Sequence, residues 1–273
     1  MPVDFNRQII EEFRANKGRV GGVFDGGRLL LLTTTGARTG APHTTPLGYL
    51  PDGDRLLVIA SAGGAPKHPQ WYRNVLANPQ VTVETGVLTY RADVVVLEGD
   101  ERERMFARAV EFDPGWGDYQ ARSGRLLPVV ALLPIDEGPP AGGSLGAALV
   151  ALHDAFRLEL ELIRAEVARS GPRLGAQLRV NCLTLCQGLH VHHEREDGFM
   201  FPALEGRYPE LAPVMRQLRA EHETVARLLG ELQALLADDQ VEQRTLSEEV
   251  ERLTRELEAH LEYEEKNLVP LLG

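Results

Sequence analysis

Four histidines are spaced almost evenly along the second half of the 273-residue chain: His153, His192, His222 and His260. The midpoints between consecutive histidines fall in helix-breaking or strongly polar stretches, at Gly171/Pro172, Arg207 and Val241. An antiparallel pair of helices mirrors its residues about the connecting loop, so residues equidistant from the loop lie at one level. The spacing therefore predicts that four imidazoles meet in one layer of a helical bundle. Such layers, when they include carboxylates, hold transition metals.

Four segments of this half have the 3.6-residue periodicity of amphipathic helices: Ser144–Ser170, Arg173–Leu204, Glu210–Ala237 and Glu242–Leu271. Each apolar stripe contains one of the four histidines. The stripe of the second segment is Leu178, Leu185, Leu189, His192, Glu196 and Phe199. In the fourth segment His260 is followed four residues later by Glu264. Residues four apart lie on one helix face, so the pattern predicts two buried carboxylates beside the histidines.

Burial of several imidazoles and carboxylates together costs several kcal/mol unless they are paired or bind a metal ion. A single buried histidine is ordinarily a hydrogen-bonded core residue. Four at one level, together with Glu196 and Glu264, favour a metal site instead. Mixed nitrogen and oxygen ligands suit iron or manganese, and six candidate ligands indicate two metal ions rather than one.

Short β-rich runs separated by turn residues fill the first half: Leu29–Thr35, Thr44–Leu50, Leu56–Ser61, Val81–Thr85, Leu88–Leu97 and Val129–Pro134. They predict an antiparallel barrel, interrupted by helices at Pro69–Ala77 and Asp100–Val110. A preceding helix at Asp4–Ala15 has one apolar stripe, formed by Phe5, Ile9, Ile10 and Phe13. The stripe favours packing on the barrel over contact with a membrane surface. The fold class is α+β, a barrel followed by an up-down four-helix bundle.

The two halves differ in charge. Residues 1–135 hold 15 basic and 15 acidic side chains, so the net charge of −11 belongs to the remainder. The stretch 136–144 is rich in proline and glycine, which predicts a linker between a barrel domain (1–135) and a bundle domain (145–273). Neither half has the basic excess that nucleic acid binding requires.

The remaining composition indicates a soluble cytoplasmic protein, with peripheral membrane contact through the first helix as the alternative. No run of about 18 apolar residues could span a bilayer, and the N-terminal residues lack the apolar core of a signal peptide. Cys182 and Cys186 lie four residues apart in a helical pattern. That spacing is awkward for a disulfide, so buried free thiols are expected.

The barrel half contains one loop with the chemistry to bind an anion. Thr33–Gly40 is a strand that enters a polar, glycine-containing loop, where backbone amides and Arg38 are available. An ordinary hairpin turn is the other interpretation. No nucleophile paired with a base, and no cluster of metal ligands, is found in the sequence of this half.

Three strings in this half have the order, spacing and residue choice of the deazaflavin-dependent nitroreductase family: LTTTGARTGAPHTTPLGYL, VIASAGGAPKHPQWYRNVLANPQVTV and DPGWGDYQARSGRLLPVV. The resemblance covers about residues 5–135. It implies a split β-barrel, as in flavin reductases. Such a barrel binds reduced F-420 deazaflavin and passes a hydride to quinones, nitroaromatics or activated alkenes. A barrel that binds FMN or haem, as relatives of this fold do, is the alternative.

The resemblance also implies roles for single residues. Arg38, Thr39 and Gly40 would lie near the phosphate and acidic tail of the cofactor. Four consecutive residues would border the deazaflavin ring: Ser61, Ala62, Gly63 and Gly64. Trp71 and Asn74 belong to the family signature PxWYxNLxANP, although core packing is an equal interpretation of Trp71. Trp116 and Tyr119 fall where the family places aromatic side chains beside the substrate, and they are the candidate catalytic residues.

The chain departs from this family at two positions. A well-studied branch has Ser-Lys-Gly-Gly where this chain has Ser61-Ala-Gly-Gly, so a cationic contact to the cofactor is absent or is supplied by Lys67. One aromatic residue that follows Tyr119 in that branch is also missing, and Arg122 lies nearby in the sequence. Both departures bear on which acceptor is reduced.

Two strings in the second half, HHEREDGFMFPAL and HLEYEEKNLVPLL, resemble the hemerythrin-like HHE cation-binding domain over about residues 145–272. The H-x3-E pattern of that domain maps onto His192/Glu196 and His260/Glu264, and His193 or Glu194 could replace a ligand through a register shift. Oxygen-carrying hemerythrins have a second histidine one turn after the third-helix ligand, where this chain has Ala226. The incomplete set favours redox sensing, oxygen or peroxide reduction, or iron handling over oxygen transport.

Together these features predict a two-module oxidoreductase. The barrel would transfer hydride from reduced deazaflavin to a quinone or nitro compound. The bundle would carry a non-haem di-iron centre, or manganese, that binds, senses or reduces oxygen, peroxide or nitric oxide. The alternative is a bundle without catalytic activity, a sensor or metal buffer that regulates a separate barrel reductase.

Overall fold

The computed structural model describes residues 3–135, 144–170, 174–238 and 240–272. These residues form two compact units: one holds the strands with helices α1–α4, and the other holds α5, α7–α9 and most of α6. Each unit is described by itself. The predicted linker, apart from Ser144, and the predicted turn at Gly171/Pro172 lie outside the described residues.

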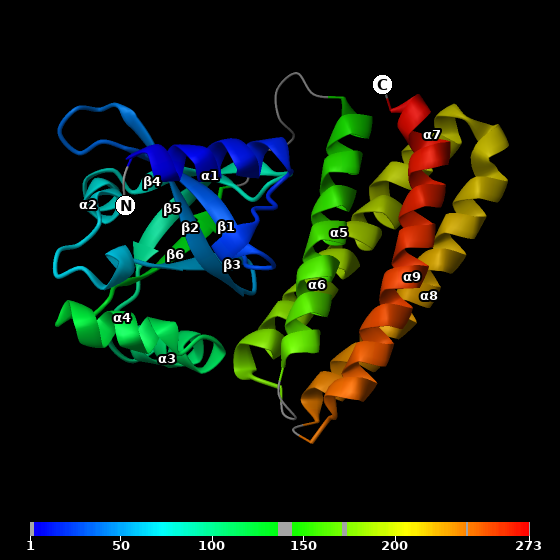
Figure 1. Cartoon of the computed structure of the whole chain (residues 1–273). Coiled ribbons are helices and arrows are strands. Elements are labelled where there is room, and N and C mark those ends of the chain that lie inside the picture. The colour runs from blue at the N-terminus through cyan, green and yellow to red at the C-terminus, as the bar shows by residue number, and fades with distance from the viewer. Residues whose placement is uncertain (1–2, 136–143, 171–173, 239, 273) are drawn as a thin grey trace. The chain divides into compact units, whose positions relative to one another are not determined.

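The first unit is a closed six-stranded barrel (Figure 1). Its strands are β1 (Leu29–Thr35), β2 (Pro42–Asp52), β3 (Arg55–Ile59), β4 (Gln80–Glu84), β5 (Thr89–Val96) and β6 (Val129–Pro134). They pair in the order β1-β2-β3-β6-β5-β4, and β1 closes the barrel by pairing with β4. All six pairings are antiparallel. The predicted antiparallel barrel is confirmed, with strand ends displaced by one or two residues.

Strand β1 shows how the barrel is buried on both sides. Its four leucines are all buried, and alternate side chains point to opposite faces of a strand. Leu30 and Leu32 pack inside the barrel, whereas Leu29 and Leu31 pack outside it. The outer pair contacts the apolar stripe of α1 (Val3–Ala15), including the buried Phe13. The structure therefore bears out packing of this helix on the barrel.

Three further helices belong to this unit: α2 (Gln70–Ala77), α3 (Gly99–Phe112) and α4 (Gly115–Ser123). The sequence predicted α2 and α3 but not α4. Gly115 and Gly117 have low helix propensity, which hides the helix in a scan for periodicity. Its end is clearer, because Gly124 has φ +65° and forms a left-handed cap. Helix α4 carries both predicted catalytic aromatics.

The second unit is built from four long helical segments, as predicted (Figure 1). They are α5 (Leu145–Arg169), α6 (Ala176–Arg195) continued by α7 (Phe201–Arg207), α8 (Ala212–Ala237) and α9 (Gln243–Leu268). The Ser144 side chain caps α5 by accepting a hydrogen bond from the Ala147 amide. The chain turns at Tyr208 and again before Gln243, close to the predicted positions. Among the described residues no helix is both long and apolar enough to cross a membrane.

The second helical segment is interrupted by a π-helical turn at Glu196–Met200, which the sequence pattern did not predict. The Phe201 amide bonds the carbonyl of Glu196, five residues earlier, so the turn contains one residue more than an α-helical turn. The extra residue moves the buried stripe. Phe199, predicted to be buried, is 78% exposed, and Phe201 takes the core position at 0% exposure. The prediction for Phe199 was therefore wrong, because it assumed a continuous α-helix.

The two phenylalanines give a test of this register. Phe201→Ala should lower the free energy of unfolding by about 3–5 kcal/mol, because it removes a fully buried ring. Phe199→Ala should change it by less than about 0.5 kcal/mol, because its ring is exposed. Denaturant titrations of both variants measure the difference. A larger cost at Phe199 would show that the helix continues without the π turn.

Candidate functional sites

Seven buried side chains from the four helical segments meet in the bundle core. They are His153 from α5, His192 and His193 from α6, Glu196 at the start of the π turn, His222 from α8, and His260 and Glu264 from α9. Each is at most 7% exposed. They form two groups of potential ligands in which the donor atoms lie within 4.8 Å of one another. One group is His193, Glu196, His222 and His260, and the other is His153, His192, Glu196 and Glu264.

The two carboxylates lie between the groups. Glu196 Oε1 is 3.2 Å from His192 Nε2, and Glu196 Oε2 is 3.4 Å from His222 Nε2. On the opposite helix Glu264 Oε2 lies 3.4 Å from His153 Nε2 and 3.8 Å from His260 Nε2. Glu196 thus directs one oxygen to each group, whereas a single oxygen of Glu264 lies near both. The arrangement fits two adjacent metal ions better than one.

Many donor atoms of this cluster lack a hydrogen-bond partner in the described part of the chain. They are Nε2 of His193, His222 and His260, and both carboxylate oxygens of Glu196 and Glu264. Buried polar atoms are nearly always satisfied, because an unsatisfied group costs its full desolvation free energy. Nitrogen and carboxylate donors without thiolates are the ligands of iron and manganese. These residues therefore fit a metal centre by their burial and by their chemistry.

Burial lowers the pKa of His192, His193 and His260, which favours the neutral imidazole that binds metal. Desolvation and the neighbouring His153 lower the pKa of His192 to about 3. Desolvation and the adjacent His222 lower the pKa of His193 even further. Glu196 behaves in the opposite sense: burial and the nearby Glu264 raise its pKa to about 10. A cation bound here would stabilise the carboxylate form of Glu196 by replacing its proton.

Three further carboxylates lie behind the histidines. Glu265 Oε1 is 2.8 Å from His153 Nδ1, Glu221 Oε2 is 3.0 Å from His260 Nδ1, and Asp197 Oδ2 is 3.1 Å from His222 Nδ1. The contacts of His153 and His260 are hydrogen bonds, which fix each ring with its Nε2 directed into the centre. The contact of His222 with Asp197 is an ion-pair distance without a hydrogen bond. The sequence prediction missed all three, although each is adjacent in sequence to a predicted ligand.

The residues that follow His192 differ in burial and direction. His193 is 6% exposed and its ring stacks on that of His222, with centroids 4.1 Å apart. Glu194 points away from the core, because its exposed side chain lies 3.3 Å from the exposed His190. Five imidazoles thus converge in this bundle. His193 therefore brings a fifth imidazole to the cluster from α6, whereas the α8 position one turn after His222 is Ala226.

In the barrel unit, Asn74 organises the loop that holds Arg38, Thr39 and Gly40. The Asn74 side chain is fully buried, and its Oδ1 accepts a hydrogen bond of 3.2 Å from the Ala37 amide. Its amide nitrogen donates to Thr34 Oγ1 at 3.0 Å. Asn74 therefore fixes the predicted anion-binding loop from the buried side of the loop. The three loop residues themselves are exposed.

The predicted ring-binding loop has an unusual backbone. Ala62, Gly63 and Gly64 have φ values of +50°, +62° and +80°. Left-handed conformation is costly for alanine, and strain of this kind often marks a functional site. Arg125 holds the loop in place, with Nη2 donating to the carbonyls of Ala60 and Ser61 at 3.0 and 3.2 Å. A Cβ added at Gly63 would meet nothing within 4 Å, so the face of this loop is open.

The predicted aromatic residues occupy two different environments. Trp71 is 4% exposed and packs in the barrel core, as its structural interpretation predicted. Trp116 and Tyr119 are half-buried and pack edge to face, with ring centroids 5.9 Å apart. Arg122 joins this pair to the strained loop, because its Cζ lies 5.1 Å from the Tyr119 ring centroid and its Nε lies 3.0 Å from a Cβ built on Gly64. Lys67 is exposed at the end of the same loop.

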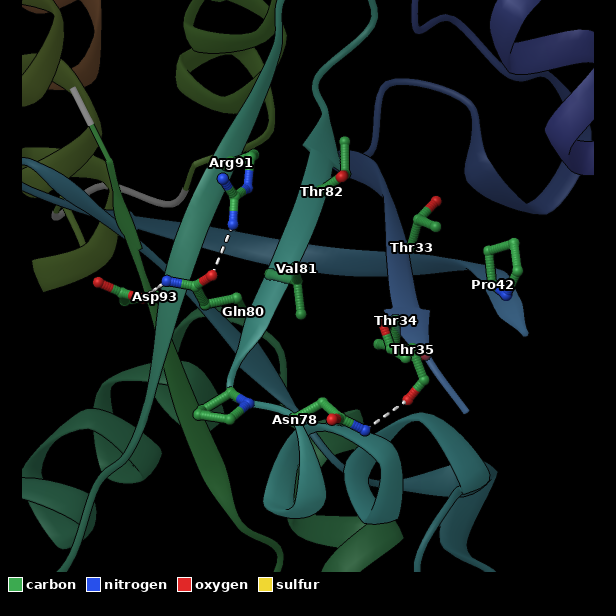
Figure 2. A pocket seen from close by; sticks show the side chains of 11 residues that line it. Thr33, Thr34, Thr35, Pro42, Asn78, Gln80, Val81, Thr82, Arg91 and Asp93 are labelled. Carbon is green, nitrogen blue, oxygen red and sulfur yellow. Dashed lines mark hydrogen bonds between the residues drawn. The ribbon is translucent and has the colours of Figure 1, made fainter. Parts of the chain in front are cut away.

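Two grooves mark the barrel surface. One, of about 690 Å³, is lined by residues of α1, β2 and α2, and Trp71 and Asn74 are among them. The other, of about 650 Å³, contains none of the predicted cofactor residues (Figure 2). Polar side chains line it and bond to one another, as Arg91 does to Gln80 and Gln80 to Asp93. The first groove is therefore the better candidate for part of a ligand site.

Comparisons with known proteins follow the same division. Residues 5–134 match the family described as F420H(2)-dependent quinone reductase, and residues 145–272 match the hemerythrin HHE cation binding domain. An F420H(2)-dependent quinone reductase of Mycobacterium tuberculosis is 39% identical over 124 residues, which cover 44% of this chain and 83% of that protein. A second F420H(2)-dependent quinone reductase assigned to that organism is 34% identical over 105 residues, covering 38% and 88%. A solved F420-H2 dependent reductase is 40% identical, covers 38% of this chain and 93% of its own, and has a TM-score of 0.36.

The relatives of the first half define an oxidoreductase, and the second half, which holds the clustered histidines, matches a domain described as cation-binding. The chain belongs to the F420H(2)-dependent quinone reductase family through its first half and carries a hemerythrin HHE domain in its second. Both predicted resemblances are thereby confirmed. The individual site residues of each half stay predictions.

The carboxylates behind the histidines can be tested separately from the ligands. Glu221→Gln should weaken Fe²⁺ binding by about 10- to 100-fold, because it removes the anion that orients His260. Glu223→Gln, an exposed position on the same helix, is the matched control and should leave the affinity unchanged. Anaerobic competition titrations with a chelator measure both. Equal affinities in the two variants would show that Glu221 does not support the centre.

Proposed function

We propose that the barrel binds reduced F-420 deazaflavin and catalyses hydride transfer to a quinone or nitro compound. Membership of the reductase family supports the reaction class. The structural observation that carries the proposal is the loop Ala62–Gly64, with three consecutive left-handed residues, an open face, and the pair Trp116 and Tyr119 close by through Arg122. A loop of this kind lets a planar ring approach the backbone closely.

The chain's residues then have separate tasks. The exposed loop with Arg38, Thr39 and Gly40 contacts the anionic tail of the cofactor, and Asn74 holds that loop. Ser61 and the strained loop border the ring, with Lys67 as the nearby cation. When bound, the deazaflavin supplies the hydride. Trp116 and Tyr119 position the acceptor and exclude water from it. Trp71 supports the site through core packing.

In the same proposal the bundle holds two iron ions, with manganese as the alternative metal. The group with His193, His222 and His260 offers three imidazoles to one ion, and the group with His153 and His192 offers two to the other. Glu196 and Glu264 lie between them. Such a centre supplies one-electron or two-electron redox chemistry, suited to oxygen, peroxide or nitric oxide.

The cofactor part of the proposal is tested at Asn74. Asn74→Ala should weaken binding of oxidised F-420 by about tenfold, because the loop with Arg38 loses buried hydrogen bonds. Asn78→Ala removes one solvent-exposed hydrogen bond from a half-buried side chain and should change the affinity less than twofold. Quenching of deazaflavin fluorescence gives both dissociation constants, and melting curves verify folding. Absence of binding to the unmodified chain would refute the deazaflavin assignment itself.

Electron transfer between the two modules is tested by comparing oxygen with menadione as the acceptor. In iron-loaded protein, His260→Ala should abolish oxygen-dependent oxidation of reduced F-420 and leave the rate with menadione within about twofold, because His260 serves only the metal centre. Stopped-flow absorbance of the deazaflavin measures both rates. Identical rates with every acceptor would eliminate coupling. They would favour a bundle that senses or stores metal beside an independent reductase.

A further inference from the structure

Arg122 occupies the point where the predicted cofactor loop and the predicted acceptor aromatics meet. It lies in the last turn of α4, and its Nε and Cζ would be 3.0 and 3.4 Å from a Cβ at Gly64. Gly64 has φ +80° and no side chain, so the arginine side chain packs directly against its backbone. A Cβ at position 64 would require the Arg122 side chain to shift by a few tenths of an ångström. The left-handed φ is the stronger reason for a glycine at this position.

The other side of Arg122 faces the aromatic pair. Its Cζ lies 5.1 Å from the ring centroid of Tyr119, within the range of a cation–π contact. Trp116 packs against the far edge of that tyrosine. No ion pair to Arg122 is found within the described ranges, and the side chain is exposed. Its positive charge is thus held in place by the loop and the ring but is not neutralised by a carboxylate.

The reaction creates a need for such a charge. When a quinone accepts a hydride, a new bond to hydrogen forms and the electron pair of the broken donor bond ends on the quinone. The immediate product is a hydroquinone monoanion, which then takes a proton from solvent. The quinone is reduced by two electrons and the deazaflavin is oxidised by two. A fixed cation beside the acceptor stabilises the anion as it develops.

We infer that Arg122 contacts the acceptor oxygen and stabilises its negative charge during hydride transfer, an inference that rests on the proposed deazaflavin-dependent activity. The guanidinium also makes the site selective for acceptors that carry or develop negative charge on oxygen. A guanidinium suits this task because its donors are fixed in one plane and keep their charge at all working pH values.

The inference is tested with Arg122→Gln and Arg122→Lys in the full-length protein. Arg122→Gln should lower kcat with menadione by about 10- to 100-fold and leave KM within threefold, because the contact strengthens only in the transition state. Arg122→Lys should recover part of kcat, since it retains the charge. Arg104→Gln, an exposed position on α3 with the same change of charge, is the control and should match the unmodified protein.

A binding measurement separates Arg122 from a cofactor contact. With oxidised F-420 bound, no hydride is available, so the anion of a hydroxynaphthoquinone serves as a stable mimic of the product anion. Arg122→Gln should weaken its binding by at least tenfold and leave the dissociation constant of F-420 within twofold. Unchanged kcat and anion binding would overturn the inference. Weaker F-420 binding with normal kcat would overturn it too, by assigning Arg122 to the cofactor. An unmodified chain that neither binds F-420 nor reduces menadione would instead refute the proposed function.

Discussion

The second half of the chain depends on an electrostatic constraint: five imidazoles and two carboxylates are packed into a core that gives most of their inward-facing atoms no partner among the described residues. In a dry interior such atoms cost several kcal/mol together. A pair of cations between Glu196 and Glu264 would satisfy them at once. The surrounding carboxylates serve the same end, since Glu265 and Glu221 hydrogen-bond the outer nitrogens of His153 and His260 and thereby orient both rings.

The π turn is best understood as part of this constraint. It allows Glu196 to face the centre while Asp197, the next residue, lies beside His222. It also brings the Phe201 ring onto His222, with centroids 5.4 Å apart. His222 is thereby held between Phe201 and His193. A regular helix would place Phe201 elsewhere, so the irregular turn and the geometry of the centre depend on each other.

In the barrel, too, polar side chains hold the candidate site residues in position, but here they are a neutral amide and a guanidinium. Asn74 is buried and fixes one loop, while Arg125 fixes the other through backbone carbonyls. Asn74 and Arg125 can therefore determine the shape of a binding site without contacting the ligand. The residues that remain free to do so are exposed or half-buried on the loops themselves. Asn74 is therefore assigned here to positioning the cofactor loop, although the family signature grouped it with the cofactor residues.

Patterns of spacing predicted the barrel, the four helical segments and the histidine layer, because strand alternation, helix periodicity and mirrored hairpins are local rules. They failed where a single residue changes the register. The π turn moved burial from Phe199 to Phe201 and was invisible to a fixed period. Helix α4 was missed because its glycines hide the periodicity. The contact between Arg122 and Gly64 joins residues far apart in sequence, so only the fold reveals it.

We propose that the bundle core is a two-metal centre. This proposal is tested most directly by the metal stoichiometry of the purified chain after anaerobic loading with Fe²⁺ and removal of free ions, measured by elemental analysis against protein concentration. The account predicts two irons per chain. One iron per chain would contradict the bridging role of Glu196 and Glu264, and none would show that the buried cluster is not a metal site.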